Sequence, residues 1–262
     1  MTQTLIPIHT GRKSPYMLEI TRHDACITRL PTALHGATLV HITDFHGGFG
    51  NTEPVFEEAI ARVNALKPDL ILFTGDYIND TNRNDFPIHE ILGRFEARLG
   101  AYGSFGNHDH RRGIVATRRA VERGGVRVLH NENVCIADGL WLAGVDDYYE
   151  GKPDLPRTLA GIPEDVTPIV LSHNPTFIEK IDRDLFMLSG HTHGGQIVLP
   201  LLSARLIVKL HLHCNQVAGW YHYGRSHIYV NRGIGVTGKP FRYNCPAEIA
   251  VFRLLRGAGA KE

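Results

Sequence analysis

Apolar runs of strand length alternate with amphipathic helical segments in the first half of the chain. Residues 37–46 and 69–77 are short apolar runs that each end in polar or acidic residues. Between them, residues 53–67 carry apolar side chains at intervals of three and four before Pro68, which cannot continue a helix. The order strand, helix, strand predicts a parallel βαβ unit.

Strand-like runs become more frequent toward the C-terminus. Further helices are expected at 86–100, 112–125, 155–163 and 175–182. Further strands are expected within 16–30, 101–110, 126–146, 167–175, 186–190, 216–223, 226–233 and 247–255. Residues 1–15 are expected to be loosely structured. Because no repeat, low-complexity tract or linker separates these elements, the sequence predicts one domain over residues 1–262.

Composition is that of an ordinary globular protein. Of the 262 residues, 43% are hydrophobic and 21% are charged, which is enough apolar material for a sizeable core. The formal net charge of +1 gives no global attraction to nucleic acid, so no nucleic-acid partner is predicted. Any binding of an anion must therefore be local.

The cysteines and the first residues of the chain favour a cytoplasmic protein with reduced thiols. The cysteines are far apart and form no CxxC pair: Cys26, Cys135, Cys214 and Cys245. The first 20 residues lack the continuous apolar segment of a secretory signal. No run reaches the roughly 18 uninterrupted apolar residues that a membrane span needs.

The segment FMLSGHTHGGQI at 186–197 carries the most informative local pattern. His191 and His193 are two residues apart, so in an extended backbone both imidazoles face the same side. The glycines that follow, Gly194 and Gly195, let the backbone approach a bound group closely. Taken alone, the pattern is more often that of two polar residues in a surface turn.

Polar residues that can bind a metal occur at the ends of five predicted strands. They are Asp44, His46, Asp76, Asn107, His173, His191 and His193. In open α/β sheets, ligands bind beyond the carboxyl ends of the strands, which is where these residues fall. Imidazole, carboxylate and amide donors without thiolate suit Mn²⁺, Fe or Zn²⁺.

The number of donors indicates two divalent metal ions. Seven donors are too many for one ion, and a carboxylate can bridge two. Two divalent ions carry about four positive charges against the two carboxylates Asp44 and Asp76, which leaves an excess that attracts phosphate. Ion pairs about 3.5–4 Å apart are used by phosphatases and nucleases to activate water. We expect Mn²⁺, with Fe, Zn²⁺ and Mg²⁺ as alternatives.

The ordered set of motifs resembles the calcineurin-like metallophosphoesterase superfamily. The motifs are DxH at 44–46, GD at 75–76, GNHD at 106–109, His173 before Asn-Pro, and GHTHGGQ at 190–196. The strand-rich ending at 230–249 is similar to a bacterial phosphodiesterase branch of it. The resemblance implies an α/β fold that is a four-layer αββα sandwich, with two mixed sheets flanked by helices. It also implies hydrolysis of a phosphodiester or phosphoanhydride by metal-activated water.

Each metal ligand is assigned through this resemblance. Asp44, His46, Asp76 and His193 would hold the first ion. Asp76, as the bridge, would hold the second together with Asn107, His173 and His191.

The resemblance also implies catalytic residues beside the ions. His108 would contact the phosphate and help the leaving group depart, a task suited to imidazole. Asp109 could hydrogen-bond to that ring and orient it. Arg111 and Arg112 could touch a substrate phosphate, or could be solvated charges on a helix.

Substrate class depends on residues 197–212, an unusually apolar segment directly after the histidine motif. It could be a loop or hairpin on a membrane or lipid substrate, with its basic residues at the headgroups, or a buried strand. Related bacterial enzymes cleave the lipid-linked pyrophosphate UDP-diacylglucosamine, so a lipid-linked phosphate ester and a peripheral membrane location are considered. A non-catalytic scaffold is the rival function, but such members lose ligands, and here all seven positions and His108 match.

Overall fold

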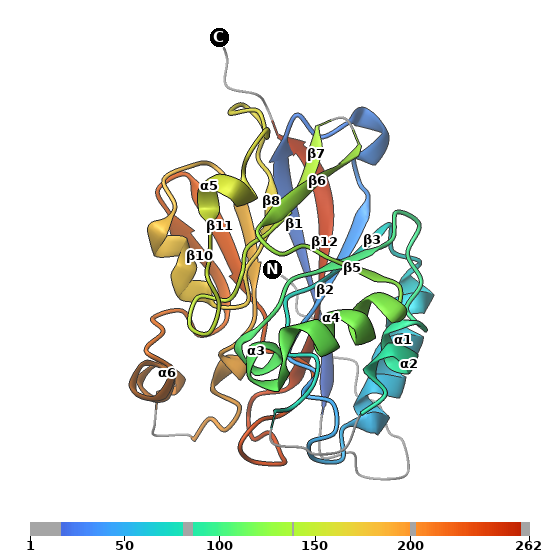
Figure 1. The fold of residues 1–262 in the computed structure, drawn as a ribbon, viewed down its shortest axis with the longest axis vertical. Coiled ribbons are helices and arrows are strands. Elements are labelled where there is room, and N and C mark those ends of the chain that lie inside the picture. Colours follow the sequence, from blue (N-terminus) through green and yellow to red (C-terminus); the bar gives the residue numbers. More distant parts are fainter. Residues whose placement is uncertain (1–16, 81–85, 138, 200–202, 258–262) are drawn as a thin grey trace.

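Two six-stranded sheets form the centre of the molecule (Figure 1). The computed structural model describes residues 17–80, 86–137, 139–199 and 203–257. The first sheet has the order β1 (Leu18–Thr28), β12 (Ala247–Gly257), β2 (Thr38–Ile42), β3 (Leu70–Phe73), β4 (Ala101–Gly103), β5 (Val126–Val128). The second has the order β10 (Gly219–Tyr223), β11 (Ser226–Val230), β9 (Phe186–Ser189), β8 (Ile169–Leu171), β7 (Leu140–Gly144), β6 (Glu132–Ala137).

Helices connect the parallel strands and cover the sheets. They are α1 (Glu53–Leu66), α2 (Ile88–Leu92), α3 (Asn107–Arg112), α4 (Ile114–Arg123), α5 (Leu155–Thr158) and α6 (Ala204–Leu212). Short 3₁₀ turns occur at Thr32–Leu34, Pro175–Lys180 and His193–Gly195. The predicted βαβ unit is present: β2 and β3 are parallel, with Val40 paired to Ile71, and α1 joins them. Both sheets are mixed, since β12 is antiparallel to β2 and β6 is antiparallel to β7.

Three apolar clusters define the layers. Leu72 of the first sheet and Leu171 and Leu188 of the second share a cluster between the sheets. A second cluster joins the other face of the first sheet to α1, α2 and α4, and a third lies on the other face of the second sheet. The predicted four-layer αββα arrangement is therefore confirmed. It brings the carboxyl ends of strands from both sheets to one edge of the molecule.

Several predicted helices differ in length from those observed. The expected helix at 112–125 starts earlier and breaks into α3 and α4 at Gly113, whose φ of +113° no helix permits. The helices expected at 86–100 and 155–163 shorten to α2 and α5. The expectation for residues 1–15 lies outside the described residues.

The structure overturns both shapes expected within residues 197–212. The buried strand and the loop or hairpin are wrong for Ala204–Leu212, because these residues form helix α6, with Leu206 and Leu210 exposed. Periodicity alone could not settle this, since a short, mostly apolar run is compatible with a strand or a helix. Within the described ranges, no helix is long and apolar enough to cross a bilayer.

Candidate metal centre

Both sheets deliver polar side chains to the same edge. Asp44 and His46 follow β2, Asp76 follows β3, and Asn107 begins α3 after β4. From the second sheet, His173 follows β8, and both His191 and His193 follow β9. Six of these side chains are fully or almost fully buried, and His191 is 8% exposed. The structure therefore brings together all seven residues that the sequence proposes as ligands.

The backbone at these residues is unusual. Asp44, His46, Asp76, His191 and His193 all have positive φ, between 47° and 71°. L-residues adopt this region at a cost, and such residues concentrate where function requires a particular side-chain direction. The chain thus turns sharply just after each strand and points these groups inward.

Two glycines make the close approach possible. A Cβ atom on Gly190 would collide with a carboxylate oxygen of Asp44. A Cβ atom on Gly106 would collide with a carboxylate oxygen of Asp76. These glycines, part of the GHTHGGQ and GNHD motifs, leave room for segments from different strands to meet.

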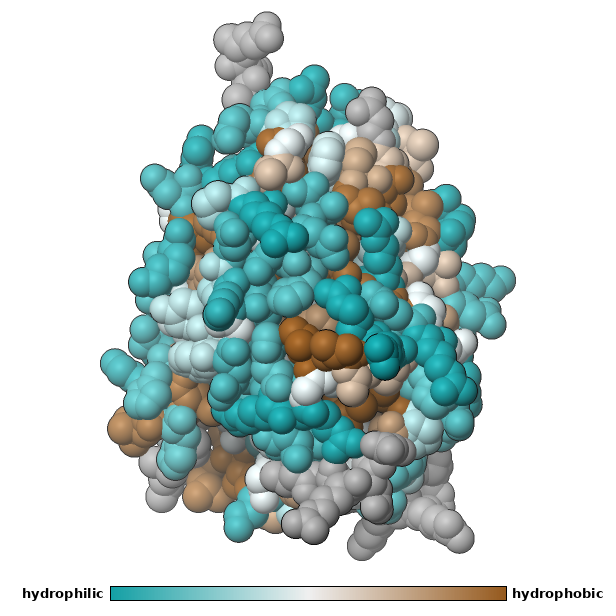
Figure 2. All heavy atoms as spheres, viewed as in Figure 1, coloured by the Kyte–Doolittle hydropathy of each residue, from teal (hydrophilic) through white to brown (hydrophobic). Residues whose placement is uncertain are grey.

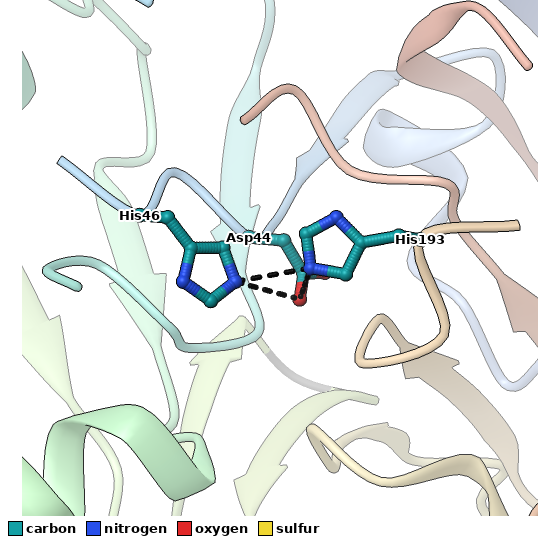
Figure 3. A group of neighbouring side chains, drawn as sticks. All are labelled: Asp44, His46 and His193. Carbon is teal, nitrogen blue, oxygen red and sulfur yellow. Dashed lines mark hydrogen bonds and ion pairs between the residues drawn. The ribbon is translucent and has the colours of Figure 1, made fainter. Parts of the chain in front are cut away.

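One half of the centre is formed by Asp44, His46 and His193 (Figure 3). The Nε2 atoms of His46 and His193 face each other at 3.0 Å. The Nε2 atom of His193 also lies 3.2 Å from Oδ1 of Asp44. Figure 3 shows the two rings and the carboxylate converging on one point.

The other half is formed by His173, His191 and Asn107. Nδ1 of His191 lies 3.2 Å from Nε2 of His173 and 2.9 Å from Oδ1 of Asn107. The Nδ1 atom of His173 lies 2.7 Å from the carbonyl of Thr74 and donates to it, which leaves Nε2 to face the centre.

Asp76 stands between the two halves. Its Oδ2 atom lies 3.2 Å from Nε2 of His173 and 3.5 Å from Nε2 of His46. Its other oxygen, Oδ1, accepts the backbone N–H of His108 at 2.9 Å. This is the position that a bridging carboxylate would occupy.

The donor set fits divalent cations. Two ring nitrogens about 3 Å apart cannot both present lone pairs to each other without a proton or a cation between them, and within this buried centre the arrangement occurs twice. Burial lowers the pKa of His46, and it lowers the pKa of His191 to about 3, so both rings are neutral, as metal binding requires. Burial would raise the pKa of Asp44, but the adjacent His193 holds that pKa below its usual value.

His108 lies beside the centre, with the carboxylate of Asp80 next to its ring. Its ring contacts that of His46, with centroids 4.6 Å apart, and its Nδ1 atom lies 2.9 Å from Oδ1 of Asp80. The expectation that Asp109 orients His108 is wrong. The Asp109 carboxylate instead accepts the backbone N–H groups of Gly106, Asp76 and Tyr77 at 2.8–3.0 Å.

Asp80 was missed because it belongs to no motif. Its only sequence signal is its place four residues after Asp76, in the loop that leaves the same strand. Asp109 positions the backbone and not the His108 ring, because its carboxylate holds the loop after β3 to the start of α3.

Arg111 and Arg112 end helix α3. Arg111 is exposed and pairs with Glu150, with its Nη2 atom 2.8 Å from Oε1. Its Nη1 atom is 3.8 Å from Oδ2 of Asp80. A contact of either arginine with substrate stays a prediction.

Residues 37–195 match the family model described as calcineurin-like phosphoesterase. The chain belongs to the calcineurin-like phosphoesterases. This family is metal-dependent and hydrolyses phosphoesters, which agrees with the buried donor set at the sheet edge.

Relatives of this phosphoesterase match over most of its length. Metallophosphoesterase YkuE of Bacillus subtilis is 34% identical over 92% of this chain and 86% of that protein. Phosphodiesterase YaeI of Escherichia coli is 31% identical, covering 83% of this chain and 82% of YaeI. UDP-2,3-diacylglucosamine pyrophosphatase LpxG of Chlamydia muridarum is 24% identical, covering 95% and 92%. Other relatives are longer: this chain spans 59% of a metallophosphoesterase of Helicobacter pylori.

Proposed function

We propose that this protein is a dinuclear metal-dependent phosphohydrolase that cleaves a phosphodiester or phosphoanhydride bond. The observation that carries the proposal is the pair of facing imidazole contacts, at 3.0 and 3.2 Å, on either side of Asp76. Asp44, His46, His193 and Asp76 would hold one cation, and Asp76, Asn107, His173 and His191 the other. Two bound cations would supply an activated water and neutralise charge on the phosphate. Mn²⁺ is the proposed ion, with Fe, Zn²⁺ and Mg²⁺ as alternatives.

The chain's own residues would orient the substrate and move a proton. His108 is not among the seven donors, and Asp80 lies 2.9 Å from its Nδ1 atom, so Nε2 would be the atom that protonates the departing oxygen. The amide of Asn107 lies beside His191 and would donate to a phosphate oxygen. Arg111 would release Glu150 to contact a second phosphate group.

Hydrolysis of bis(p-nitrophenyl) phosphate tests the proposal. Protein treated with chelator should be inactive, and added Mn²⁺ should restore turnover. Asp76→Asn should abolish activity, because an amide cannot bridge two cations. Asp165→Asn is the matched control, since this carboxylate is exposed on the surface. Metal-independent turnover, or full activity of the Asp76→Asn protein, would contradict the proposal.

A surface next to the centre favours a lipid-linked substrate. Residues 186–247 contain no Asp or Glu. Among the described residues of this stretch, five large apolar side chains are exposed: Leu199, Leu206, Leu210, Phe241 and Tyr243. Figure 2 shows brown atoms where Figure 1 draws α6. An exposed apolar patch with basic neighbours and no carboxylates complements an anionic membrane.

This patch is connected directly to the metal centre. The backbone N–H of Val198 donates to the carbonyl of Tyr243, so the two exposed segments lie side by side. The hydroxyl of Tyr149 donates to the carbonyl of Leu212, and its ring lies 5.6 Å from that of His191. A lipid bound at α6 would therefore present its phosphate near the ions. The relative named UDP-2,3-diacylglucosamine pyrophosphatase favours a lipid-linked pyrophosphate.

The proposed location is the cytoplasmic surface of a membrane. All four cysteines are free, as expected for reduced thiols. The rival function, a scaffold without catalysis, predicts fewer than one bound metal per chain together with no turnover, which elemental analysis measures.

A further inference from the structure

A second group of metal-binding side chains lies outside the seven-residue centre. It consists of His110 in α3, His130 just after β5, and Asp146 just after β7. Nε2 of His110 lies 2.6 Å from Oδ1 of Asp146, and Nε2 of His130 lies 3.0 Å from Oδ2. One donor atom from each residue lies within 4.8 Å of the others.

The Asp146 carboxylate is fixed by its own loop. Its Oδ1 atom accepts the N–H of Asp147 at 2.8 Å, and Oδ2 accepts the N–H of Lys152 at 2.7 Å. The loop closes tightly on the carboxylate, because a Cβ atom on Gly151 would overlap it. Asn131 adds a further tie, since its Oδ1 accepts the N–H of Asp146 at 3.0 Å.

The two imidazoles are also held in place. Both rings pack edge-on against Phe105, with centroids 6.3 Å away for His110 and 5.6 Å away for His130. A site whose ligands keep their positions without an ion loses little entropy when an ion binds.

His130 carries the observation that points to a ligand. Its Nε2 atom is buried and makes no hydrogen bond among the described residues, although it lies 3.0 Å from a carboxylate oxygen. A buried ring nitrogen that faces a carboxylate without hydrogen-bonding to it suits a cation shared between them. The His130 side chain as a whole is 30% exposed, which leaves a route for an ion.

We propose that His110, His130 and Asp146 form a separate site for one divalent cation of the zinc class. Two imidazoles and a carboxylate, with a remaining position open to water, are a ligand set that Zn²⁺ accepts. The ion would tie α3, which carries Asn107 and His108, to the loop after β7 of the other sheet. The site would thus hold the catalytic helix in place and need not contact substrate.

The proposed site can be tested by measuring bound metal per chain, a quantity that does not depend on catalytic activity. Protein loaded with excess Zn²⁺ and freed of loosely bound metal is compared with the variant His110→Gln/His130→Gln. The variant should hold one equivalent less per chain. The matched control is His222→Gln/His227→Gln, which removes an exposed pair of histidines whose Nδ1 atoms are 2.6 Å apart without a carboxylate between them. The control should retain the wild-type content.

The same comparison on Asp76→Asn protein separates this site from the dinuclear centre. In the Asp76→Asn background, the single variant His130→Gln should bind one equivalent less metal per chain and lose the visible absorption of bound Co²⁺. Circular dichroism should show an intact fold. Equal metal content in the proteins with and without His110 and His130 would overturn the proposal. The three side chains would then be held together by hydrogen bonds without a metal ion. An equal loss of bound metal in the His222→Gln/His227→Gln control would also overturn the proposal, because it would show that the metal adsorbs to surface histidines.

Discussion

In the proposed mechanism, Asp80 would decide which nitrogen of His108 faces the reacting phosphate. The carboxylate lies 2.9 Å from Nδ1, which would leave the other ring nitrogen for the leaving group. Asp80→Asn should lower kcat about tenfold to a hundredfold, the range seen when an orienting partner is lost. The loss should be larger for an alkyl leaving group than for p-nitrophenolate, because only the alkoxide needs a proton to depart. A leaving-group series run on both proteins measures this difference, and equal losses across the series would contradict the assigned role.

Asp109 is needed for the fold of the site. Its carboxylate accepts three backbone N–H groups, and the amide of Asp109→Asn would oppose at least one of them with its own N–H. The free energy of unfolding should fall by about 1–3 kcal/mol, the cost of a buried unsatisfied donor. Urea denaturation measures it, with the exposed Asp24→Asn as control. An unchanged midpoint would show that the loop is held by other contacts.

The residue types of the site could be predicted, but the contacts between them could not. Asp44, Asp76 and His173 follow strands, and the fold gathers strand ends at one edge, so their meeting follows from the pattern. The partner of His108 does not follow from spacing. The choice between Asp80 and Asp109 depends on which backbone amides the neighbouring loop presents.

At the scale of elements, α6 shows where local pattern stops being informative. An apolar run is compatible with a strand, a buried helix or an exposed helix, and only the surrounding structure leaves Leu206 and Leu210 in solvent at 48% and 64% exposure. The break at Gly113 was equally invisible as a boundary, because glycine tolerates both helix and turn.

Exposed leucines on α6 should bind membranes. Leu206→Ser/Leu210→Ser should reduce flotation with anionic vesicles several-fold, because each leucine contributes burial of apolar area on binding. Both side chains are exposed, so the fold should be unaffected. Val115→Ser is the control, since this side chain is 64% exposed on α4. Equal flotation of the wild-type and double-variant proteins would remove the membrane-docking idea without touching the metal centre.

At the scale of the whole molecule, ligands from both sheets converge on one centre. Bound metal should therefore stabilise the contact between the sheets. Free Mn²⁺ at about 100 times its Kd should add about 2.7 kcal/mol to the free energy of unfolding. Thermal melting with chelator and with Mn²⁺ measures the shift, which should shrink in Asp76→Asn protein. An identical shift in that variant would place the stabilising ion elsewhere.

The order of the strands within each sheet is the part of the architecture that the sequence does not predict. The C-terminal strand β12 lies between β1 and β2, with Ile249 paired to Ile20. Local periodicity predicts that each strand exists, but it does not indicate which strand more than 200 residues away pairs with it. The layered αββα arrangement came from the family resemblance, and the structure supplies the order within each layer.

The buried carboxylate of Glu248, on β12 of the first sheet, binds residues of the second sheet. It accepts hydrogen bonds from the hydroxyl of Tyr229 on β11 and from Arg232 just after β11, at 2.5 and 3.0 Å. Burial would raise the pKa of Glu248, but Arg232 holds it below its usual value. A depressed carboxyl pKa stabilises the fold above the unfolded pKa of about 4.5 and loses that contribution as the pH falls below it.

Urea unfolding of chelator-treated protein between pH 7 and pH 3.5 tests this contribution. The part of wild-type stability that depends on Glu248 should begin to fall near pH 4.5, and in Glu248→Gln protein the fall below that pH should be shallower, because the variant has no proton to bind there. Glu248→Gln should also be less stable at pH 7, since Arg232 then loses a buried charged partner and keeps its ion pair with Glu19. Exposed Glu164→Gln is the control. Parallel pH profiles for the wild-type and Glu248→Gln proteins would show that other carboxylates govern acid stability.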